Sequence, residues 1–142
     1  MILARCENGW SIFRNACYKF FNEKKDWNAA DKACRQFGAR LTSIHSKEEA
    51  DFVRGLVDQS SFHNTWIGGY WGGYSFQWID GSTFNFTYWD ANEPKTYRDG
   101  REIFYCIEIR ESSHKWNDKH CWNSLQNFVC KKQKGKLSKI VQ

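Results

Sequence analysis

The sequence predicts one α+β domain that is cross-linked by disulfide bonds, and three observations support this prediction. The 142-residue chain is long enough to bury a single hydrophobic core. Helical periodicity is confined to the first 57 residues, and short strand-like runs rich in Gly, Trp, Tyr and Phe fill residues 66–130. Helices followed by runs of strands favour an α+β fold over a parallel βαβ fold. The six cysteines, an even number, predict three disulfides and an oxidising, extracellular compartment.

The first part of the chain contains, in order, a predicted hairpin and two predicted helices. Aromatic runs at 9–13 and 17–21 predict a small hairpin that Cys6 and Cys17 can staple. An amphipathic helix ends at Gly38. Its apolar face comprises Trp27, Ala30, Ala33, Cys34 and Phe37. Ser46 and Glu49 form a capping box that opens a second helix. Its predicted buried face comprises Ala50, Val53, Leu56 and Val57.

The second part of the chain predicts strands around a long loop. Residues 105–109 and 127–130 are strand-like, and residues 68–105 are predicted to be mostly irregular. A loop of that length inside a compact domain is usually functional. The domain is predicted to span residues 1–131, and residues 132–142 form a lysine-rich basic tail.

The cysteine spacing and the composition exclude several classes of protein. There is no Cys-x-x-Cys pair and no histidine at zinc-finger spacing, which argues against a structural zinc site. The cysteine positions alone leave the disulfide pairing open. No apolar run is long enough to span a membrane. Nucleic-acid binding has only the net charge of +5 in its favour, so it is not predicted. Asn85-Phe86-Thr87 matches the N-glycosylation triplet, which suits a secreted chain.

Two short motifs carry the oxygen ligands that a calcium ion requires. Glu93-Pro94-Lys95 precedes Cys106, and Trp116-Asn117-Asp118 precedes Cys121. Pro94 is the only proline of the chain, and an X-Pro bond in a polar stretch is where a cis peptide can aim a carboxylate. Two carboxylates and an amide oxygen from separate segments therefore predict a calcium site.

Together, these residues resemble the C-type lectin-like domain in its long, three-disulfide form, over about residues 6–131. Trp66-Ile67-Gly68-Gly69 resembles the core motif of the family, and Trp78-Ile79-Asp80-Gly81-Ser82 resembles the segment that starts its long loop. The resemblance implies a fold of two helices flanking small antiparallel sheets. It also implies the disulfide pairs Cys6–Cys17, Cys34–Cys130 and Cys106–Cys121.

In sugar-binding members, a Glu-Pro-Asn motif, another loop Glu and a Trp-Asn-Asp motif hold a calcium ion that accepts two sugar hydroxyls. Glu93, Asn117 and Asp118 match this pattern, and Glu93 resembles the mannose type. The resemblance implies that the same three residues bind both the ion and the sugar, with Lys95 also contacting the sugar. Trp116 is expected to pack beneath the site.

The chain departs from the family pattern at two positions. Lys95 stands where Asn is usual, which removes an oxygen ligand and brings an ammonium group close to the ion. Phe104 stands where the loop Glu is usual, so Glu102 is expected to be the fourth ligand, with Asp99 as its substitute. Thr96 replaces the acid of an accessory site, so one calcium ion is expected.

The sequence therefore predicts calcium-dependent carbohydrate binding of the mannose type by a secreted or extracellular domain, with glycans or glycoproteins as partners. The alternative is a calcium-independent module for an anionic glycan or a protein receptor. An anionic glycan would use the basic cluster of Lys95, Arg98, Arg101, Lys115 and Lys119. A protein would use the aromatic cluster of Tyr70, Trp71, Tyr74, Phe76 and Tyr97. An enzyme is not predicted, because His114 and His120 have no nucleophile–base set beside them.

Overall fold

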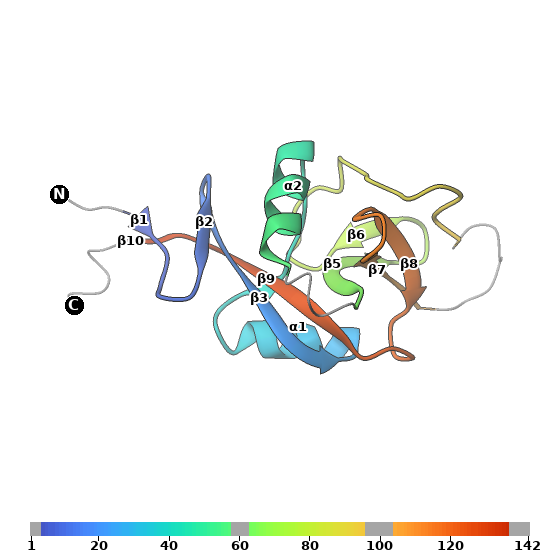
Figure 1. Cartoon of the computed structure of the whole chain (residues 1–142), viewed down its shortest axis with the longest axis horizontal. Coiled ribbons are helices and arrows are strands. Elements are labelled where there is room, and N and C mark those ends of the chain that lie inside the picture. The colour runs from blue at the N-terminus through green and yellow to red at the C-terminus, as the bar shows by residue number, and fades with distance from the viewer. Residues whose placement is uncertain (1–3, 58–62, 96–103, 137–142) are drawn as a thin grey trace.

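Two helices and ten strands form the described part of the structure, a computed structural model that describes residues 4–57, 63–95 and 104–136 (Figure 1). The helices are α1 (Trp27–Arg35) and α2 (Lys47–Leu56). The strands are β1 (Ala4–Arg5), β2 (Ser11–Phe13), β3 (Ala16–Lys25), β4 (Arg40–Leu41), β5 (Thr65–Trp71), β6 (Phe76–Trp78), β7 (Tyr105–Ile109), β8 (Trp116–His120), β9 (Gln126–Gln133) and β10 (Gly135–Lys136). Within the described ranges, neither helix is long and apolar enough to cross a membrane.

The strands build a mixed sheet along the length of the molecule. The hydrogen-bonded order is β2-β3-β9-β5-β7-β8, with β4 added to β9 and β6 added to β5. β5 runs parallel to β9, with Thr65 opposite Asn127, and the other pairs are antiparallel. The small antiparallel sheets that were expected therefore form one mixed sheet through this single parallel pair. In Figure 1, β1 and β10 lie side by side at one end of the molecule, and β8 lies at the other end.

Local capping fixes both ends of α1. The carboxylate of Asp26 accepts a hydrogen bond from the backbone N–H of Ala29 at 2.8 Å, which satisfies one of the free donors of the first turn. The helix ends at Arg35, and Gly38 follows in the left-handed region (φ +71°), as its position after the apolar stripe predicts. Phe37 lies past the helix end and is 43% exposed, because its ring packs at the rim of the core against Trp10.

The second helix begins at its predicted cap. The hydroxyl of Ser46 accepts from the backbone N–H of Glu49 at 3.1 Å. The Glu49 carboxylate accepts from the N–H of His45 and not from that of Ser46, so the reciprocal bond of the capping box is shifted by one residue. Ala50 and Val53 are buried as predicted, and the last turn is only partly buried.

The three disulfides join the pairs that the family resemblance implies. Cys6 bonds to Cys17, Cys34 to Cys130, and Cys106 to Cys121. The second of these links α1 to β9 inside a core that also contains Trp66 and Phe128. It spans 96 residues, and in a chain-entropy model the closure of a loop of this length stabilises the fold by roughly 4–5 kcal/mol.

Two segments contain more regular structure than the sequence predicts. β5 continues to Trp71 and turns at Gly72 into β6, so the irregular part of the long loop starts at Ile79. Gly73, with φ +101°, supplies the turn, and the Gly-Gly pair was the available sequence signal. At the C-terminal end, Lys132 and Gln133 pair with β3, and β10 pairs with β1. Strand pairing thus includes residues from 132 to 136, which belong to the segment expected to be the basic tail.

Candidate functional site

The candidate site lies where the segment before Lys95 runs beside β8. Trp89 forms an isolated β-bridge with Trp116, and the backbone N–H of Asp90 donates a hydrogen bond to the Trp116 carbonyl at 2.8 Å. The Glu93-Pro94 bond is cis, a conformation that its proline allows. The backbone N–H of Lys95 then donates to Asp118 Oδ1 at 2.8 Å. This pairing holds the Glu-Pro-Lys segment against the strand that carries the other predicted ligands.

Packing beneath the site fixes the two ligand positions on β8. Asn117 lies opposite Glu108 of β7, and Asp118 lies opposite Ile107. Trp116, which precedes them, is 1% exposed, and its ring meets Trp78 edge-on at 5.5 Å. The prediction that Trp116 packs beneath the site is confirmed.

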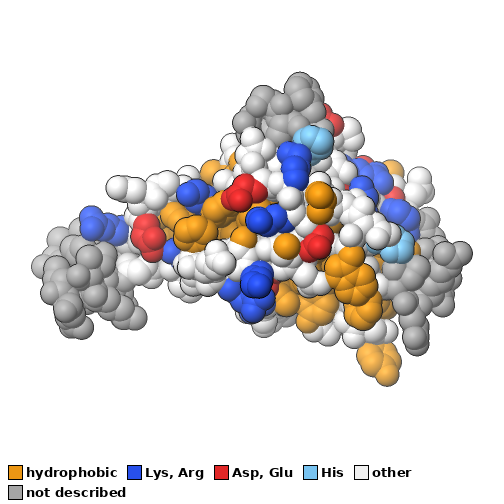
Figure 2. All heavy atoms as spheres, turned by 90° about the horizontal axis from the view of Figure 1, so that it is seen from below, with side chains coloured by type: hydrophobic (Ala, Val, Ile, Leu, Met, Phe, Trp, Pro, Cys, Tyr) orange, Lys and Arg blue, Asp and Glu red, His pale blue; other side chains and the backbone are white. Residues whose placement is uncertain are grey.

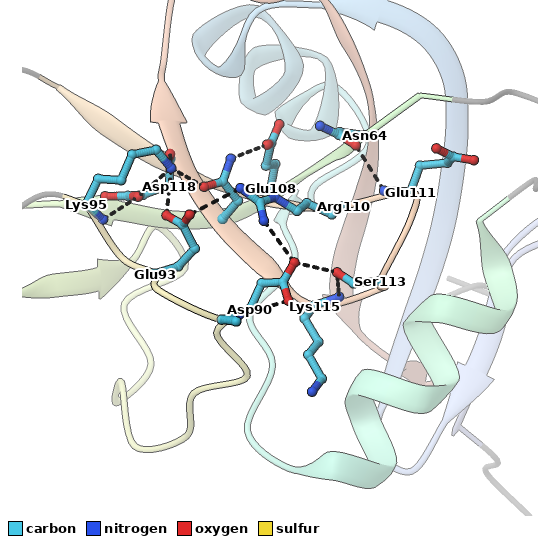
Figure 3. A network of polar contacts seen from close by, with 12 residues as sticks. Asn64, Asp90, Glu93, Lys95, Glu108, Arg110, Glu111, Ser113, Lys115 and Asp118 are labelled. Atoms are coloured by element: carbon cyan, nitrogen blue, oxygen red, sulfur yellow. Dashed lines mark hydrogen bonds and ion pairs between the residues drawn. The ribbon is translucent and has the colours of Figure 1, made fainter.

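The ammonium group of Lys95 lies among the three predicted calcium ligands (Figure 3). Lys95 Nζ is 2.6 Å from Glu93 Oε1 and 3.1 Å from the Asp118 backbone carbonyl. It also donates to Asn117 Oδ1 and lies 3.5 Å from Asp118 Oδ1. We call Lys95 Nζ and these three residues the ammonium site. The structure therefore brings Glu93, Asn117 and Asp118 together as the sequence predicts, but around a side chain of the protein itself.

The oxygens of the ammonium site are buried. The side chain of Glu93 is 8% exposed and that of Asp118 is 0% exposed, whereas that of Lys95 is 39% exposed. Burying a carboxylate is costly unless a positive partner lies next to it. Lys95 provides that partner and also presents part of its length to solvent.

A second layer of charged residues surrounds the ammonium site (Figure 3). Arg110 bonds to Glu93 Oε2 at 3.2 Å and to Asp90 Oδ2 at 2.9 Å. Asp90 accepts hydrogen bonds from Arg110 and from Ser113, and these bonds lower the pKa of Asp90 below its ordinary value. Burial lowers the pKa of Arg110, but the hydrogen bond with Asp90 and the nearby charges of Glu93, Asp90 and Glu108 together outweigh burial and raise it. Glu108, which is 1% exposed, accepts from Asn117 Nδ2 at 2.6 Å.

Sequence reasoning missed this second layer, although a signal was present. Glu108 and Arg110 are two positions apart at the end of a strand-like run, so their side chains share one side of β7 and its continuation. Asn117 of β8 lies opposite Glu108, so its side chain is on the same face of the sheet. Asp90 belongs to the polar stretch that leads into Pro94, but nothing local indicates that it pairs with an arginine twenty residues later.

The comparisons with known proteins show which family the chain belongs to. The family model described as "Lectin C-type domain" matches residues 23–132. The chain belongs to the C-type lectin domain family. It is 37% identical over 139 residues to human C-type mannose receptor 2, covering 96% of this chain but only 9% of that receptor. Family members of this kind are binding modules and not enzymes, as the sequence predicts.

Two further relatives show the range of this family. The chain is 34% identical to the snaclec coagulation factor IX/factor X-binding protein subunit B3 of Trimeresurus stejnegeri, covering 89% of this chain and 93% of the snaclec. The structure of the cow C-type carbohydrate-recognition domain of CD23, determined in the presence of a GlcNAc2Man3 oligosaccharide, superposes with a TM-score of 0.79. It is 30% identical, and the match covers 92% of this chain and 98% of that domain.

Within this C-type lectin domain, the described residues do not fit a calcium ion while Lys95 keeps its position. Calcium lies about 2.3–2.6 Å from its oxygen ligands. Lys95 Nζ is already 2.6 Å from Glu93 Oε1, so the ion and the ammonium group would claim the same space. The expected fourth ligand, Glu102, and its substitute, Asp99, lie outside the described residues. Phe104 occupies the usual ligand position and is 60% exposed.

The basic cluster is only partly available as a surface. Lys95 bonds within the ammonium site, and Lys115 Nζ lies 5.6 Å from the centre of the Tyr88 ring. Arg98 and Arg101 lie outside the described residues. On the face shown in Figure 2, the Lys and Arg side chains are scattered among other types rather than gathered in one patch.

The aromatic cluster is also only partly exposed. Tyr74 is 96% exposed, whereas Phe76 is buried and packs on Trp89. Tyr97 lies outside the described residues. The sequence did not indicate a second exposed pair, Phe104 and Trp122, which are 60% and 53% exposed with ring centres 4.9 Å apart.

Proposed function

We propose that this C-type lectin domain is an extracellular recognition module that works without calcium and binds a protein partner. The observation that carries the proposal is the position of the Lys95 ammonium group among Glu93, Asn117 and Asp118. An ammonium ion supplies positive charge and hydrogen-bond donors to the oxygens that would otherwise need a metal. The two carboxylates of the site thereby gain a positive partner from the protein itself. Three disulfides support the extracellular location.

This arrangement argues against a sugar bound through the metal. A calcium ion can hold a sugar because it accepts further oxygens beyond its protein ligands. An ammonium group has only three donor hydrogens, and here they face Glu93, Asn117 and Asp118. We therefore replace the prediction of mannose-type, calcium-dependent binding with its calcium-independent alternative.

Two features favour a protein over an anionic glycan as the partner. Lys95 and Arg110 already pair with carboxylates of the protein, so neither is free to bind a sulfate or carboxylate of a glycan. Phe104 and Trp122 present adjacent, half-exposed rings, and aromatic side chains are enriched at the centres of protein interfaces. The backbone N–H of Cys121 donates to the Phe104 carbonyl, which fixes this pair beside the Cys106–Cys121 disulfide.

A relative supports the same conclusion. The snaclec that resembles this chain over nearly its whole length is named as a subunit of a coagulation factor-binding protein. The structure of the CD23 domain, which superposes on this chain, was determined in the presence of an oligosaccharide. The family therefore includes both kinds of partner, and the ammonium site supports placing this chain among the members that do not hold a sugar through a metal ion.

Retention on immobilised mannose tests the calcium-independent part of the proposal. Wild-type protein is expected to pass through the column equally in calcium and in chelator. Lys95→Asn restores the Glu-Pro-Asn pattern and is expected to be retained in calcium alone, and adding Asp118→Ala to it should abolish that retention. Calcium-dependent retention of the wild type would overturn the proposal.

Partner capture tests the protein-binding part. Immobilised domain should capture a protein from extracellular fluid of the source organism in the presence of chelator. Phe104→Ala/Trp122→Ala should lose this capture, whereas Tyr74→Ala, which changes a more exposed aromatic residue elsewhere, should keep it. Capture that instead disappears when the fluid is treated with glycosidases would identify a glycan as the ligand.

A further inference from the structure

We infer that Asn85 is an N-glycosylation site, whose side chain the fold presents as an acceptor for an oligosaccharide. Asn85-Phe86-Thr87 is the only Asn-x-Ser/Thr triplet in the chain, and its middle residue is not proline. The inference does not depend on what the ammonium site binds. It depends on where the fold places the triplet.

The segment that carries the triplet alternates between the core and solvent. Phe84, Phe86 and Tyr88 are partly buried, whereas Asn85 and Thr87 are exposed. The ring of Phe84 stacks on Trp78 with centres 4.8 Å apart, and that of Phe86 meets Trp116 at 5.9 Å. Because successive side chains of an extended segment point to opposite sides, the packed aromatic residues direct both acceptor residues outward.

One contact orients the carboxamide of Asn85. His45 Nδ1 lies 3.2 Å from Asn85 Oδ1, and because this oxygen can only accept, the imidazole N–H is the donor. Among the described residues, Asn85 Nδ2 makes no hydrogen bond. The nitrogen is the atom that carries a glycan, so the bound oxygen and the unbound nitrogen are compatible with attachment. Attachment at Nδ2 leaves Asn85 Oδ1 able to accept the hydrogen bond from His45.

The chemistry also matches the compartment that the disulfides indicate. Disulfides form in the secretory pathway, where a lipid-linked oligosaccharide diphosphate serves as the glycan donor. A bond forms between Asn85 Nδ2 and the anomeric carbon of the oligosaccharide. The bond between that carbon and the diphosphate breaks, the lipid diphosphate leaves, and Nδ2 loses one proton to a base. No redox partner is needed.

The chain contains a natural negative control for the acceptor position. Asn127-Phe128-Val129 has the same first two residues but lacks the hydroxyl at the third position. Asn127 is also 0% exposed, within β9. Peptide mass spectrometry should therefore find the modification at Asn85 and not at Asn127. Modification of both would indicate a reaction of asparagine that does not depend on the triplet.

Expression through the secretory pathway of mammalian cells tests the inference. Wild-type protein is recovered from the medium or the cell lysate, and samples with and without peptide N-glycosidase F treatment are compared on a gel. We expect a band that moves faster after treatment, with aspartate in place of Asn85 in the peptide spectra. Asn85→Gln and Thr87→Ala should abolish the shift, and Thr87→Ser should keep it because serine also supplies the hydroxyl.

Two controls separate loss of the glycan from loss of the fold. Thr87→Ala leaves Asn85 and its contact with His45 unchanged, and Asn85→Asp keeps the oxygen that His45 binds. Both variants should form all three disulfides without the band shift. Disulfide-bonded wild-type protein with unmodified Asn85 would overturn the inference, as would a band shift that persists in Thr87→Ala.

Discussion

Replacing Lys95 with methionine removes the positive charge of the ammonium site while keeping most of the side-chain volume. Glu93 Oε1 and Asn117 Oδ1 then lose the donor that they share. Removal of one partner from a buried ion pair typically costs about 3–5 kcal/mol, and from an exposed pair about 0.2–1 kcal/mol. The side chain of Lys95 is 39% exposed and that of Glu93 is 8% exposed, so the site lies between these limits. We expect Lys95→Met to lower the free energy of unfolding by about 2 kcal/mol.

Urea unfolding and thermal melting in chelator measure this loss. For a domain of this size, about 2 kcal/mol corresponds to a fall in Tm of roughly 6 °C. Lys32→Met, at an exposed position of α1, is the matched control and should change the unfolding free energy by less than about 0.5 kcal/mol. If Lys95→Met proved as stable as this control, the ammonium group would not lie among buried oxygens, and the reasoning would be refuted.

Two further predictions concern the scaffold. Burial, reinforced by a hydrogen bond to Glu49, raises the pKa of Tyr18. The unfolded chain therefore loses this proton first, and stability should fall as pH rises above about 10. Urea titrations at several pH values should show that Tyr18→Phe weakens this fall, and an unchanged slope would contradict it. Gly68→Ala would place a Cβ 2.5 Å from the Leu41 carbonyl oxygen and should cost about 1–3 kcal/mol, whereas Gly55→Ala, with open space around it, should not destabilise α2.

Much of the fold could be predicted because its determinants are local or covalent. The cysteine order, with the Trp66-Ile67-Gly68-Gly69 motif, was sufficient to assign the family and its three disulfides. Ser46 and Gly38 marked helix boundaries through their own backbone chemistry. The parallel pairing of β5 with β9 could not be predicted in this way, because it joins residues about sixty positions apart without a local signal.

The candidate site shows the same division between local and distant determinants. The sequence identified Glu93, Asn117 and Asp118 as neighbours, and it identified Lys95 as the residue that departs from the family pattern. It did not indicate whether the lysine side chain turns away from the site or into it. That choice depends on the burial of the three oxygen ligands and on Arg110, which holds the second oxygen of Glu93. Both properties arise from tertiary packing.

Calorimetric titration of calcium into chelator-stripped wild-type protein tests the central claim most directly. Lys95→Asn serves as the comparison and Lys32→Asn as the control for the loss of a lysine. The account predicts no saturable heat for the wild type and the control, and saturable binding for Lys95→Asn, whose site regains an oxygen ligand. Saturable calcium binding by the wild type would show that the ammonium group yields to the ion, and it would contradict the claim that Lys95 takes the place of calcium.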